Sequence, residues 1–321
     1  MLDLAELRLL IDQEFNKIQF PKKPKNLYQP LSYTLSLNGK RMRPILLLMA
    51  HQLFNKDIKR AIKPALGIEV FHNFTLLHDD IMDKALLRRG QKTVHEKWNN
   101  NIAVLSGDIM LVKAYQFICD VDKHVVKDVL NVFNQAAIDV CEGQQWDMDF
   151  ETQNNVGISE YLKMIERKTS VLLSAALQIG AIIAGACHND QNNLYEFGRN
   201  MGIAFQLKDD LLDTFGSSET FGKEVGGDIM TNKKTYLYLK ALEIANENQY
   251  ETLISYYRSD DNSNEKVKNV KSIFTALEIP ELTTKLMKNF HQKAMKHLNA
   301  IESDNKDPLM FFSEKLLDRI S

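Results

Sequence analysis

The sequence is poor in residues that interrupt regular structure and in residues that cross-link it. Only 14 glycines and 7 prolines occur in 321 residues, which leaves few chain reversals and argues against a β-rich fold with many turns. The three cysteines, Cys119, Cys141 and Cys187, are an odd number without a Cys-x-x-Cys spacing. We therefore expect buried or inert thiols in a reducing compartment, not a disulfide framework.

An excess of one charge and a long apolar run are also lacking. The formal charge is −2 with a pI near 6.5, so no nucleic-acid or anionic-membrane partner is expected. The most apolar window, residues 170–186, contains Gln178 and several small residues, and we expect it to be a buried helix too short and too polar to span a bilayer. Residues 1–20 carry acids from position 3 onward and predict an amphipathic helix, not a signal peptide. The sequence predicts a soluble cytoplasmic protein.

What is present favours helices. Apolar residues make up 44% of the chain, and Leu66, Val70, Phe74 and Leu77 recur at helical spacing. We predict one all-α domain over residues 1–321, a bundle of about ten or more helices. Proline and polar clusters predict loops at 20–30 and 188–193, and Pro64 predicts a helix start.

Three aspartates are grouped in the stretch LLHDDIMDKALLRRG, residues 76–90. On a helix, Asp79 and Asp83 lie about 40° apart around the axis and roughly 6 Å apart along it, so their carboxylates share a face. The expected helix end nearby adds the negative pole of the helix dipole. An exposed acidic helix end is common, but such a group of hard oxygen ligands also suits Mg²⁺. Asp79, Asp80 and Asp83 are therefore candidate metal ligands.

The same spacing recurs in FQLKDDLLDTFG, at Asp209, Asp210 and Asp213. Two acidic groups on helices of core-like composition are hard to explain as solvated faces. If the two helices face each other, the carboxylates can hold several Mg²⁺ ions and one polyanion. Metal ions in such a site orient the substrate and neutralise a leaving group.

Cations accompany both acidic groups. Each alone is most simply a solvated surface residue. As a set they could hold a second diphosphate without a metal, because arginine binds phosphate through paired donors. The set consists of Lys40, Arg43, Arg88, Arg89, Lys168, Lys223 and Lys233.

The order of motifs resembles that of the trans-isoprenyl diphosphate synthases, or polyprenyl synthetases, over nearly the whole chain. The matching stretches are GKRMRP (39–44), HDDIMD (78–83) with RRG (88–90), KTVH (92–95), LSGD (105–108), ERKTS (166–170), FQLKDDLLD (205–213), and GKEVGGDI (222–229) with NKKT (232–235). The family usually has proline where this chain has Lys92, a loop position that is not catalytic. The resemblance implies an all-helical fold around a central substrate cavity and a reaction that joins isopentenyl diphosphate head to tail to an allylic diphosphate.

The resemblance also implies roles for the allylic side. Asp79 and Asp83 would bind Mg²⁺ with support from Asp80, and Asp209 would bind it with support from Asp210 and Asp213. Three ions are expected with substrate bound. The allylic diphosphate would be held by Arg88, Lys168, Lys223 and Lys233, and Thr169 and Gln206 would turn their dipoles toward the allylic cation.

Isopentenyl diphosphate would occupy a pocket without metal, formed by Lys40, Arg43, His72 and Arg89. A lone histidine such as His72 is more often a core residue, but its position before the acidic group matches the family's contact for this substrate. The departing diphosphate is the expected base for the final proton. The family forms homodimers, and the apolar helix over residues 101–118 predicts the interface here.

Chain length is predicted from the helix before Asp79. In the family, bulk at the fourth and fifth positions before the first aspartate stops elongation. Here Phe74 is large, Thr75 is small, and Phe71 lies further back. One aromatic residue instead of two favours a C20 product over C15. Longer C30–C50 products, or a core role for Phe74, remain alternatives.

Three other functions each leave some of these residues unexplained. A terpene cyclase would carry a different second metal motif and would not need Lys40, Arg43 and Arg89. A non-catalytic subunit of a heteromeric synthase would be expected to lose aspartates from the acidic groups. A metal buffer or structural helical protein would not need the basic set. The prenyltransferase interpretation accounts for all of these residues.

Overall fold

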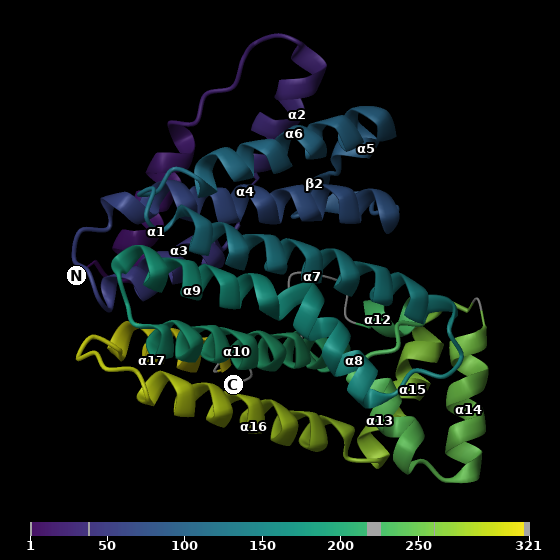
Figure 1. Cartoon of the computed structure of the whole chain (residues 1–321). Helices are drawn as coiled ribbons and strands as arrows, with labels where there is room; N and C mark the ends of the chain where they lie inside the picture. The colour runs from purple at the N-terminus through teal and green to yellow at the C-terminus, as the bar shows by residue number, and fades with distance from the viewer. Residues whose placement is uncertain (1, 38, 217–225, 260, 318–321) are drawn as a thin grey trace. The chain divides into compact units, whose positions relative to one another are not determined.

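The computed structural model describes the chain except for residues 1, 38, 217–225, 260 and 318–321. The fold class is all-α, as predicted, and Figure 1 shows long helices joined by short connections. In chain order the elements are α1 (Leu4–Asn16), α2 (Lys25–Ser36), α3 (Met42–Gln52), α4 (Lys59–Met82), β1 (Leu87–Arg88), β2 (Gln91–Lys92), α5 (Val94–Lys97), α6 (Asn100–Ile118), α7 (Val126–Thr152), α8 (Ile158–Ile165), the π-helix η1 (Glu166–Ser170), α9 (Val171–Ala184), α10 (His188–Phe215), α12 (Gly227–Met230), α13 (Tyr236–Ile244), α14 (Glu247–Arg258), α15 (Asn264–Ala276), α16 (Ile279–Asn299) and α17 (Asp307–Leu317).

The chain divides into two compact units. Unit 1 comprises Met1–Gln135, Ala175–Tyr195 and Ile301–Leu309, and unit 2 comprises Ala136–Ser174, Glu196–Ala300 and Met310–Ser321. Helices α7, α9, α10 and α17 contribute residues to both. The single domain predicted over residues 1–321 stays a prediction.

Close helix packing holds the acidic end of α4 in unit 1. Helix α3 is buried from Pro44 to Gln52, and a Cβ on Gly180 of α9 would come within 2.1 Å of the Leu47 carbonyl oxygen. Helix α4 lies along α6 (Figure 1), where a Cβ on Gly67 would come within 2.8 Å of the Ile118 side chain. These glycines let α9 approach α3 and let α4 approach α6 closely, so α4 is held against α6 near Gly67.

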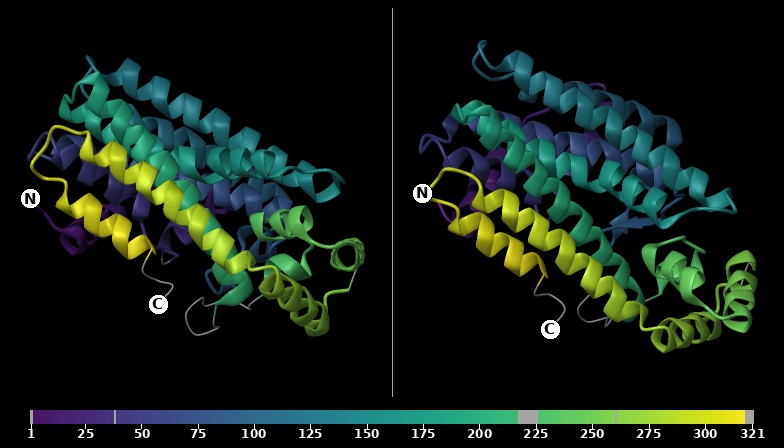
Figure 2. Two further views of the ribbon diagram at one scale, coloured as in Figure 1. Left: turned by 90° about the horizontal axis from the view of Figure 1, so that it is seen from below. Right: turned by 60° about the horizontal axis from the view of Figure 1, so that its bottom comes forward.

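Unit 2 has its own apolar core, built from α8, α10, α13, α15 and α16. Tyr161, Leu207, Leu237 and Phe274 are among its buried members. Figure 2 shows α14 and α15 gathered near the end at which α16 begins. This core fixes the second acidic group on α10.

A tight hairpin carries the two arginines that follow the first acidic group. Strands β1 and β2 pair antiparallel, with Leu87 opposite Lys92 and Arg88 opposite Gln91. The two turn residues, Arg89 (φ 54°) and Gly90 (φ 75°), both have positive φ, which is the geometry that two-residue hairpins favour. The turn therefore places Arg88 and Arg89 in different environments.

Three predicted boundaries were wrong. Residues 20–30 are not all loop, because α2 begins at Lys25 and includes Pro30, and α4 begins at Lys59, before Pro64. Both prolines are buried, so packing of the ring offsets the lost hydrogen bond. Residues 188–193 form the first turns of α10, where polar residues are typical of a helix N-terminus.

The apolar window at 170–186 belongs to a longer helical stretch than predicted. Helix α8, η1 and α9 continue into one another, and Ile158–Ala184 is long and apolar enough to cross a membrane by length and composition alone. However, 67% of its most apolar window is buried inside the protein. This burial favours the predicted role as a core helix.

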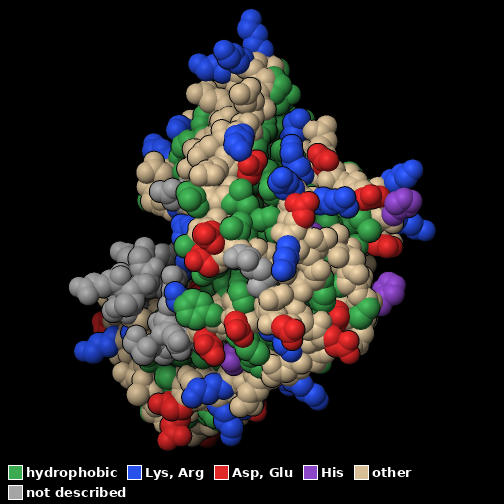
Figure 3. All heavy atoms as spheres, turned by 90° about the vertical axis from the view of Figure 1, so that its left-hand side faces the viewer, with side chains coloured by type: hydrophobic (Ala, Val, Ile, Leu, Met, Phe, Trp, Pro, Cys, Tyr) green, Lys and Arg blue, Asp and Glu red, His purple; other side chains and the backbone are tan. Residues whose placement is uncertain are grey.

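The surface carries both signs of charge. On the face drawn in Figure 3, Lys and Arg side chains and Asp and Glu side chains lie among hydrophobic and uncharged ones. Exposed apolar side chains also occur on α6, where Val104, Leu105 and Val112 are 42%, 59% and 51% exposed. They lie within about 100° of the helix circumference, because Leu105 and Val112 are seven positions apart and Val104 directly precedes Leu105.

Candidate active site

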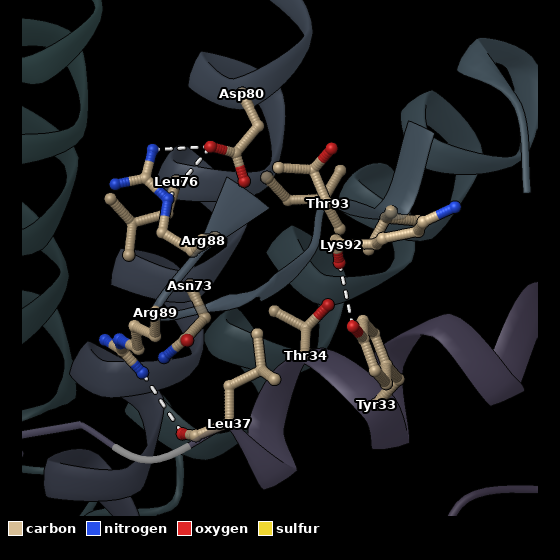
Figure 4. Close-up of a pocket in the computed structure, with 12 residues that line it drawn as sticks. Tyr33, Thr34, Leu37, Asn73, Leu76, Asp80, Arg88, Arg89, Lys92 and Thr93 are labelled. Atoms are coloured by element: carbon tan, nitrogen blue, oxygen red, sulfur yellow. Dashed lines mark hydrogen bonds and ion pairs between the residues drawn. The ribbon is translucent and has the colours of Figure 1, made fainter. Parts of the chain in front are cut away.

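The acidic end of α4 is neutralised in part by the hairpin. Arg88 donates to Asp80 Oδ1 from Nε (2.9 Å) and Nη2 (2.5 Å) (Figure 4). Its Nη2 also lies 3.8 Å from Asp79 Oδ2. Burial raises the pKa of Asp80, and the hydrogen bond and charge of Arg88 oppose that shift. Asp80 is thus held by a protein side chain, whereas Asp83 is exposed at the end of the helix.

These residues fit Mg²⁺ by the chemistry of their donors. Carboxylate oxygens are hard ligands, and Mg²⁺ in proteins is usually bound through one or two carboxylates together with phosphate and water. The guanidinium of Arg88 already lies between Asp79 and Asp80, so this end of α4 attracts a cation. In the described part of the chain, no group of three or more His, Cys, Asp or Glu side chains is placed to hold an ion by itself.

Arginines surround His72 in the same unit. The pKa of His72 lies well below its usual value, mainly because of burial and further because of Arg43, Arg89, Arg88 and Arg41. Burial also lowers the pKa of Arg43 to about 10. The imidazole is therefore neutral at pH 7 in a strongly positive environment, which is suited to binding an anion.

Hydrogen bonds to the segment before α3 hold this basic cluster in place. Arg41, buried with φ 48°, donates to Glu69 Oε1 (3.0 Å) and to the Leu35 carbonyl (2.6 Å). Arg89 donates to the Leu37 carbonyl (3.1 Å) (Figure 4). A Cβ on Gly39 would come within 2.6 Å of the Arg89 guanidinium, so a larger residue here would displace the end of the Arg89 side chain. The structure thus brings the segment that carries Lys40 to Arg89 and His72.

A pocket of about 20 Å³ opens beside these groups, lined by Asn73, Asp80, Arg88, Arg89 and Thr93 among others (Figure 4). The Tyr33 hydroxyl donates to the Lys92 carbonyl (2.8 Å) at its edge. The contact uses the backbone carbonyl of Lys92, which proline also has. Lysine in place of the family's usual proline therefore keeps this hydrogen bond.

The second acidic group lies on α10 in unit 2. Asp210 accepts hydrogen bonds from Gln206 Nε2 (3.1 Å) and from the Tyr161 hydroxyl. Burial raises its pKa to about 7, with repulsion from Asp228 in the same direction. In both motifs, then, the second aspartate is bound by neighbouring side chains, and we interpret it as a support for the other two.

Asp213 connects the end of α10 to α12. Its Oδ1 accepts from the Asp228 backbone N–H (2.9 Å), and its carbonyl accepts from the Gly226 N–H (2.6 Å). Gly226 has φ 93°, which favours glycine. Asp209 lies half-buried on the same helix. Lys223, a predicted diphosphate ligand, lies outside the described residues.

A π-helix presents Lys168 and Thr169. One extra residue in a helical turn is frequent at functional sites because it changes the direction of side chains, and η1 spans both residues. Lys168 Nζ lies 2.6 Å from Asp147 Oδ2 on α7. A Cβ on Gly143, one turn before Asp147, would come within 2.3 Å of the Lys168 backbone nitrogen, so this glycine lets α7 lie directly against η1.

Asp147 also interacts with Lys233. Burial disfavours its ionised form, but Lys233 and Lys168 together hold its pKa below the usual value. Two cations assigned to the allylic diphosphate therefore share one carboxylate in unit 2. Thr169 Oγ1 donates to Gln206 Oε1 (3.2 Å). The amide oxygen of Gln206, which was predicted to face the allylic cation, therefore already accepts a hydrogen bond. The Thr169 oxygen still has lone pairs that can face a cation.

The predicted chain-length residues belong to an aromatic cluster in unit 1. The Phe74 ring lies 5.5 Å from Phe71 and 4.8 Å from His78, and Phe71 packs edge-on against Phe133 at 5.1 Å. Phe71 is buried, whereas Phe74 and Thr75 are half-buried. Thr75 donates to the His72 carbonyl (2.9 Å).

Several residues in these networks were not predicted from the sequence. The sequence does contain a signal for Asp147. It lies one helical turn after Gly143 in an amphipathic helix, so both residues lie on the same helix face. Tyr161, Glu69 and Asp228 left none, since only the fold brings them to the acidic and basic groups.

A family model described as polyprenyl synthetase matches residues 24–274. The chain belongs to the polyprenyl synthetase family. It is 39% identical over 235 residues to a geranylgeranyl diphosphate synthase of Methanosarcina mazei, covering 73% of this chain and 72% of that one. It is 36% identical over 256 residues to a geranylfarnesyl diphosphate synthase of Natronomonas pharaonis, covering 74% and 75%.

A solved structure of a geranylgeranyl pyrophosphate synthase superposes with a TM-score of 0.94 at 45% identity and covers 98% of both chains. This polyprenyl synthetase is therefore a transferase of the prenyltransferase class. The recognition of the family from its ordered motifs is confirmed.

Proposed function

We propose that the protein condenses isopentenyl diphosphate with an allylic diphosphate, in a Mg²⁺-dependent reaction, to give an all-trans C20 prenyl diphosphate. The observation that carries this proposal is the basic cluster of Arg41, Arg43 and Arg89 around a neutral His72. Such a cluster can bind a diphosphate without metal. A cyclase, which has one diphosphate substrate, has no use for it.

The carboxylates serve the other substrate. Asp79, Asp83 and Asp209 are the proposed ligands of three Mg²⁺ ions, with Asp80, Asp210 and Asp213 in support. When bound, the ions neutralise the allylic diphosphate and make it a better leaving group. Arg88, Lys168, Lys223 and Lys233 complete its binding, and Asp147 orients Lys168.

The bond changes balance without an added reactant. The allylic C–O bond breaks, and its electron pair leaves with diphosphate. The double bond of isopentenyl diphosphate then attacks the allylic carbon, and the departed diphosphate takes the proton that is lost. Thr169, oriented by Gln206, faces its oxygen toward the transient cation. Lys40, Arg43, His72 and Arg89 hold the isopentenyl diphosphate in place. Water must be excluded because it would capture the cation.

Two further features belong to the proposal. A homodimer is supported by the exposed apolar side of α6, and a soluble cytoplasmic location without nucleic-acid partners is supported by the balanced charge. The product length is supported by Phe74, and one relative with a geranylfarnesyl name keeps products longer than C20 as a second candidate.

The direct test is turnover with Mg²⁺, isopentenyl diphosphate and each allylic primer, followed by measurement of product length. Asp79→Ala or Asp209→Ala should lower kcat by roughly a hundredfold or more, because each removes transition-state charge stabilisation. Asp304→Ala, in an exposed loop, is the control. Near-normal turnover of either acidic variant in EDTA would contradict the mechanism.

A further inference from the structure

A groove in unit 2 has no role in the proposed reaction. It has a volume of about 440 Å³ and is lined by α8, η1, α10 and α16. The lining residues recur every three or four positions on each helix, so each helix contributes one continuous face. Pockets that bind small molecules typically have volumes of roughly 300–1,000 Å³. The groove is thus large enough for a ligand.

Cations dominate its lining. Lys163, Arg199, Lys293 and Lys296 line the groove, and the only acid among the described lining residues is Glu166. Glu196, next to Arg199 on α10, supplies one more carboxylate nearby. The four cations exceed the two acids. Helix faces that carry repelling cations do not close on one another, and they attract a polyvalent anion.

Two carboxylates hold the Arg199 guanidinium in place, but its Nε has no acceptor among the described residues. Its Nη2 lies 2.7 Å from Glu196 Oε2, and its Nη1 lies 3.6 Å from Glu166 Oε1. Its Nε is buried, and no described residue offers it an acceptor. A buried donor without an acceptor is unfavourable, so Arg199 gains from a rearrangement of its side chain that brings Nε to an anion oxygen.

Apolar side chains form the rest of the lining. Leu162, Ile203 and Phe290 lie among the cations. Lys293 Nζ lies 5.0 Å from the centre of the Phe290 ring, so a charged group and an apolar surface meet at one place. This combination suits a ligand with a charged head and an apolar chain better than it suits a free anion.

We propose that the groove binds a prenyl diphosphate at a site separate from the catalytic residues. The diphosphate lies against Lys293, Lys296 and Arg199, and the prenyl chain lies over Ile203 and Phe290. The enzyme class already supplies such molecules as substrates and products, so the site would respond to their concentration.

The test is calorimetric titration of geranyl diphosphate in EDTA, which removes metal-dependent binding. K293Q/K296Q should lose one class of sites or bind there roughly tenfold more weakly, since hydrogen bonds to a charged group are strong. The matched control is K285Q/K288Q, with two exposed lysines on the same helix outside the groove. It should bind as the wild type does.

A titration with inorganic diphosphate tests whether the groove recognises the diphosphate alone or the diphosphate together with a prenyl chain. It should bind the groove more weakly than geranyl diphosphate, because it buries no apolar surface. Equal affinity of the two ligands would contradict the part of the proposal that concerns the chain. If K293Q/K296Q binds geranyl diphosphate with the same number of sites and the same affinity as the wild type, the groove is not a binding site.

Discussion

Lys168 Nζ lies 2.6 Å from Asp147 Oδ2, and Gly143, one turn earlier on α7, lies against the Lys168 backbone. The carboxylate therefore fixes the direction of a side chain that emerges from a π-helix. Lys168 belongs to the motif ERKTS, whereas Asp147 lies 21 positions earlier. The pair indicates that a phosphate ligand is oriented by a residue outside the motif that carries it.

The first prediction concerns Asp147. Asp147→Asn should raise the KM for the allylic diphosphate and lower kcat by roughly tenfold or more, because a charge-assisted hydrogen bond that orients Lys168 is weakened. The KM for isopentenyl diphosphate should stay near the wild-type value. Asp147→Glu should recover part of the loss. Asp149→Asn is the control, because Asp149 is an exposed neighbour on α7 whose Oδ1 accepts from Gln145. An equal loss there would contradict a positioning role.

The second prediction separates the two diphosphate pockets. Lys40→Ala and Arg43→Ala should mainly raise the KM for isopentenyl diphosphate, because Arg43 lies in the basic cluster around His72. Lys168→Ala should mainly impair the allylic side. Each effect should amount to roughly tenfold or more in KM. The measurement is a titration of each substrate at saturation of the other. Equal effects on both substrates from all three variants would refute the assignment.

The third prediction concerns pH and His72. Its folded-state pKa lies well below the unfolded value of 6.5, so the unfolded chain binds more protons between these two values. The stability that the neutral imidazole contributes is present above about pH 6.5 and is lost as the pH falls, at up to about 1.4 kcal/mol per pH unit. Denaturant unfolding between pH 5 and 8 should thus show a shallower slope for His72→Gln than for the wild type.

His188→Gln, at an exposed position, is the matched control and should keep the wild-type slope. The pKa values of His51 and His291 are also lowered by burial, but both residues are present in every variant. The difference between slopes therefore reports His72. Identical slopes for the wild type and His72→Gln would show that His72 titrates as in the unfolded chain.

The all-α fold class was predicted correctly, and the ordered motifs identified the family. The roles of the acidic groups, Arg43, His72 and Arg89 stay predictions that rest on short motifs of fixed spacing. The starts of α2 and α4 were misplaced because a proline was interpreted as a boundary, whereas buried Pro30 and Pro64 lie inside helices. A local signal was outweighed by burial, which no short window contains.

Hydrogen-bond partners from other segments of the chain were also not predicted. The pairs Arg88–Asp80 and Tyr161–Asp210 join residues 8 and 49 positions apart. The sequence predicted both aspartates as metal-site residues, but it could not show that each is bound by a protein side chain. Such pairing depends on the hairpin turn and on the packing of α8 against α10, which are tertiary features.

The fourth prediction is a homodimer through α6. Leu105 is 59% exposed beside Val104 and Val112, and exposed apolar groups on one helix side often mark an interface. Leu105→Glu should shift the protein from a dimer toward the 36.9 kDa monomer, because it places a charge in an apolar contact. Leu9→Glu, on α1 and equally exposed at 59%, is the control. Light scattering that finds only a monomer for the wild type at micromolar concentration would reject the dimer.

The last prediction concerns product length and Phe74. The growing chain must run away from the charged residues into apolar surroundings, and α4 before Asp79 provides them. The Phe74 ring is half-buried and rests on Phe71, which itself packs against Phe133. Because this second layer supports the ring from behind, Phe74 cannot easily turn aside from a longer chain.

Phe74→Ala should therefore lengthen the main product by one or more C5 units, because the removed ring leaves room toward Phe71. Activity should persist, since the aromatic contacts of Phe74 are with Phe71 and His78, and neither is assigned to diphosphate or metal. Phe117→Ala, another half-buried aromatic in unit 1, controls for a general loss of packing and should keep the wild-type product. Chromatography of the dephosphorylated products distinguishes these results. If Phe74→Ala makes the wild-type distribution, another residue sets the length. If the wild type already makes C40 or longer chains, the ring of Phe74 does not block elongation at all.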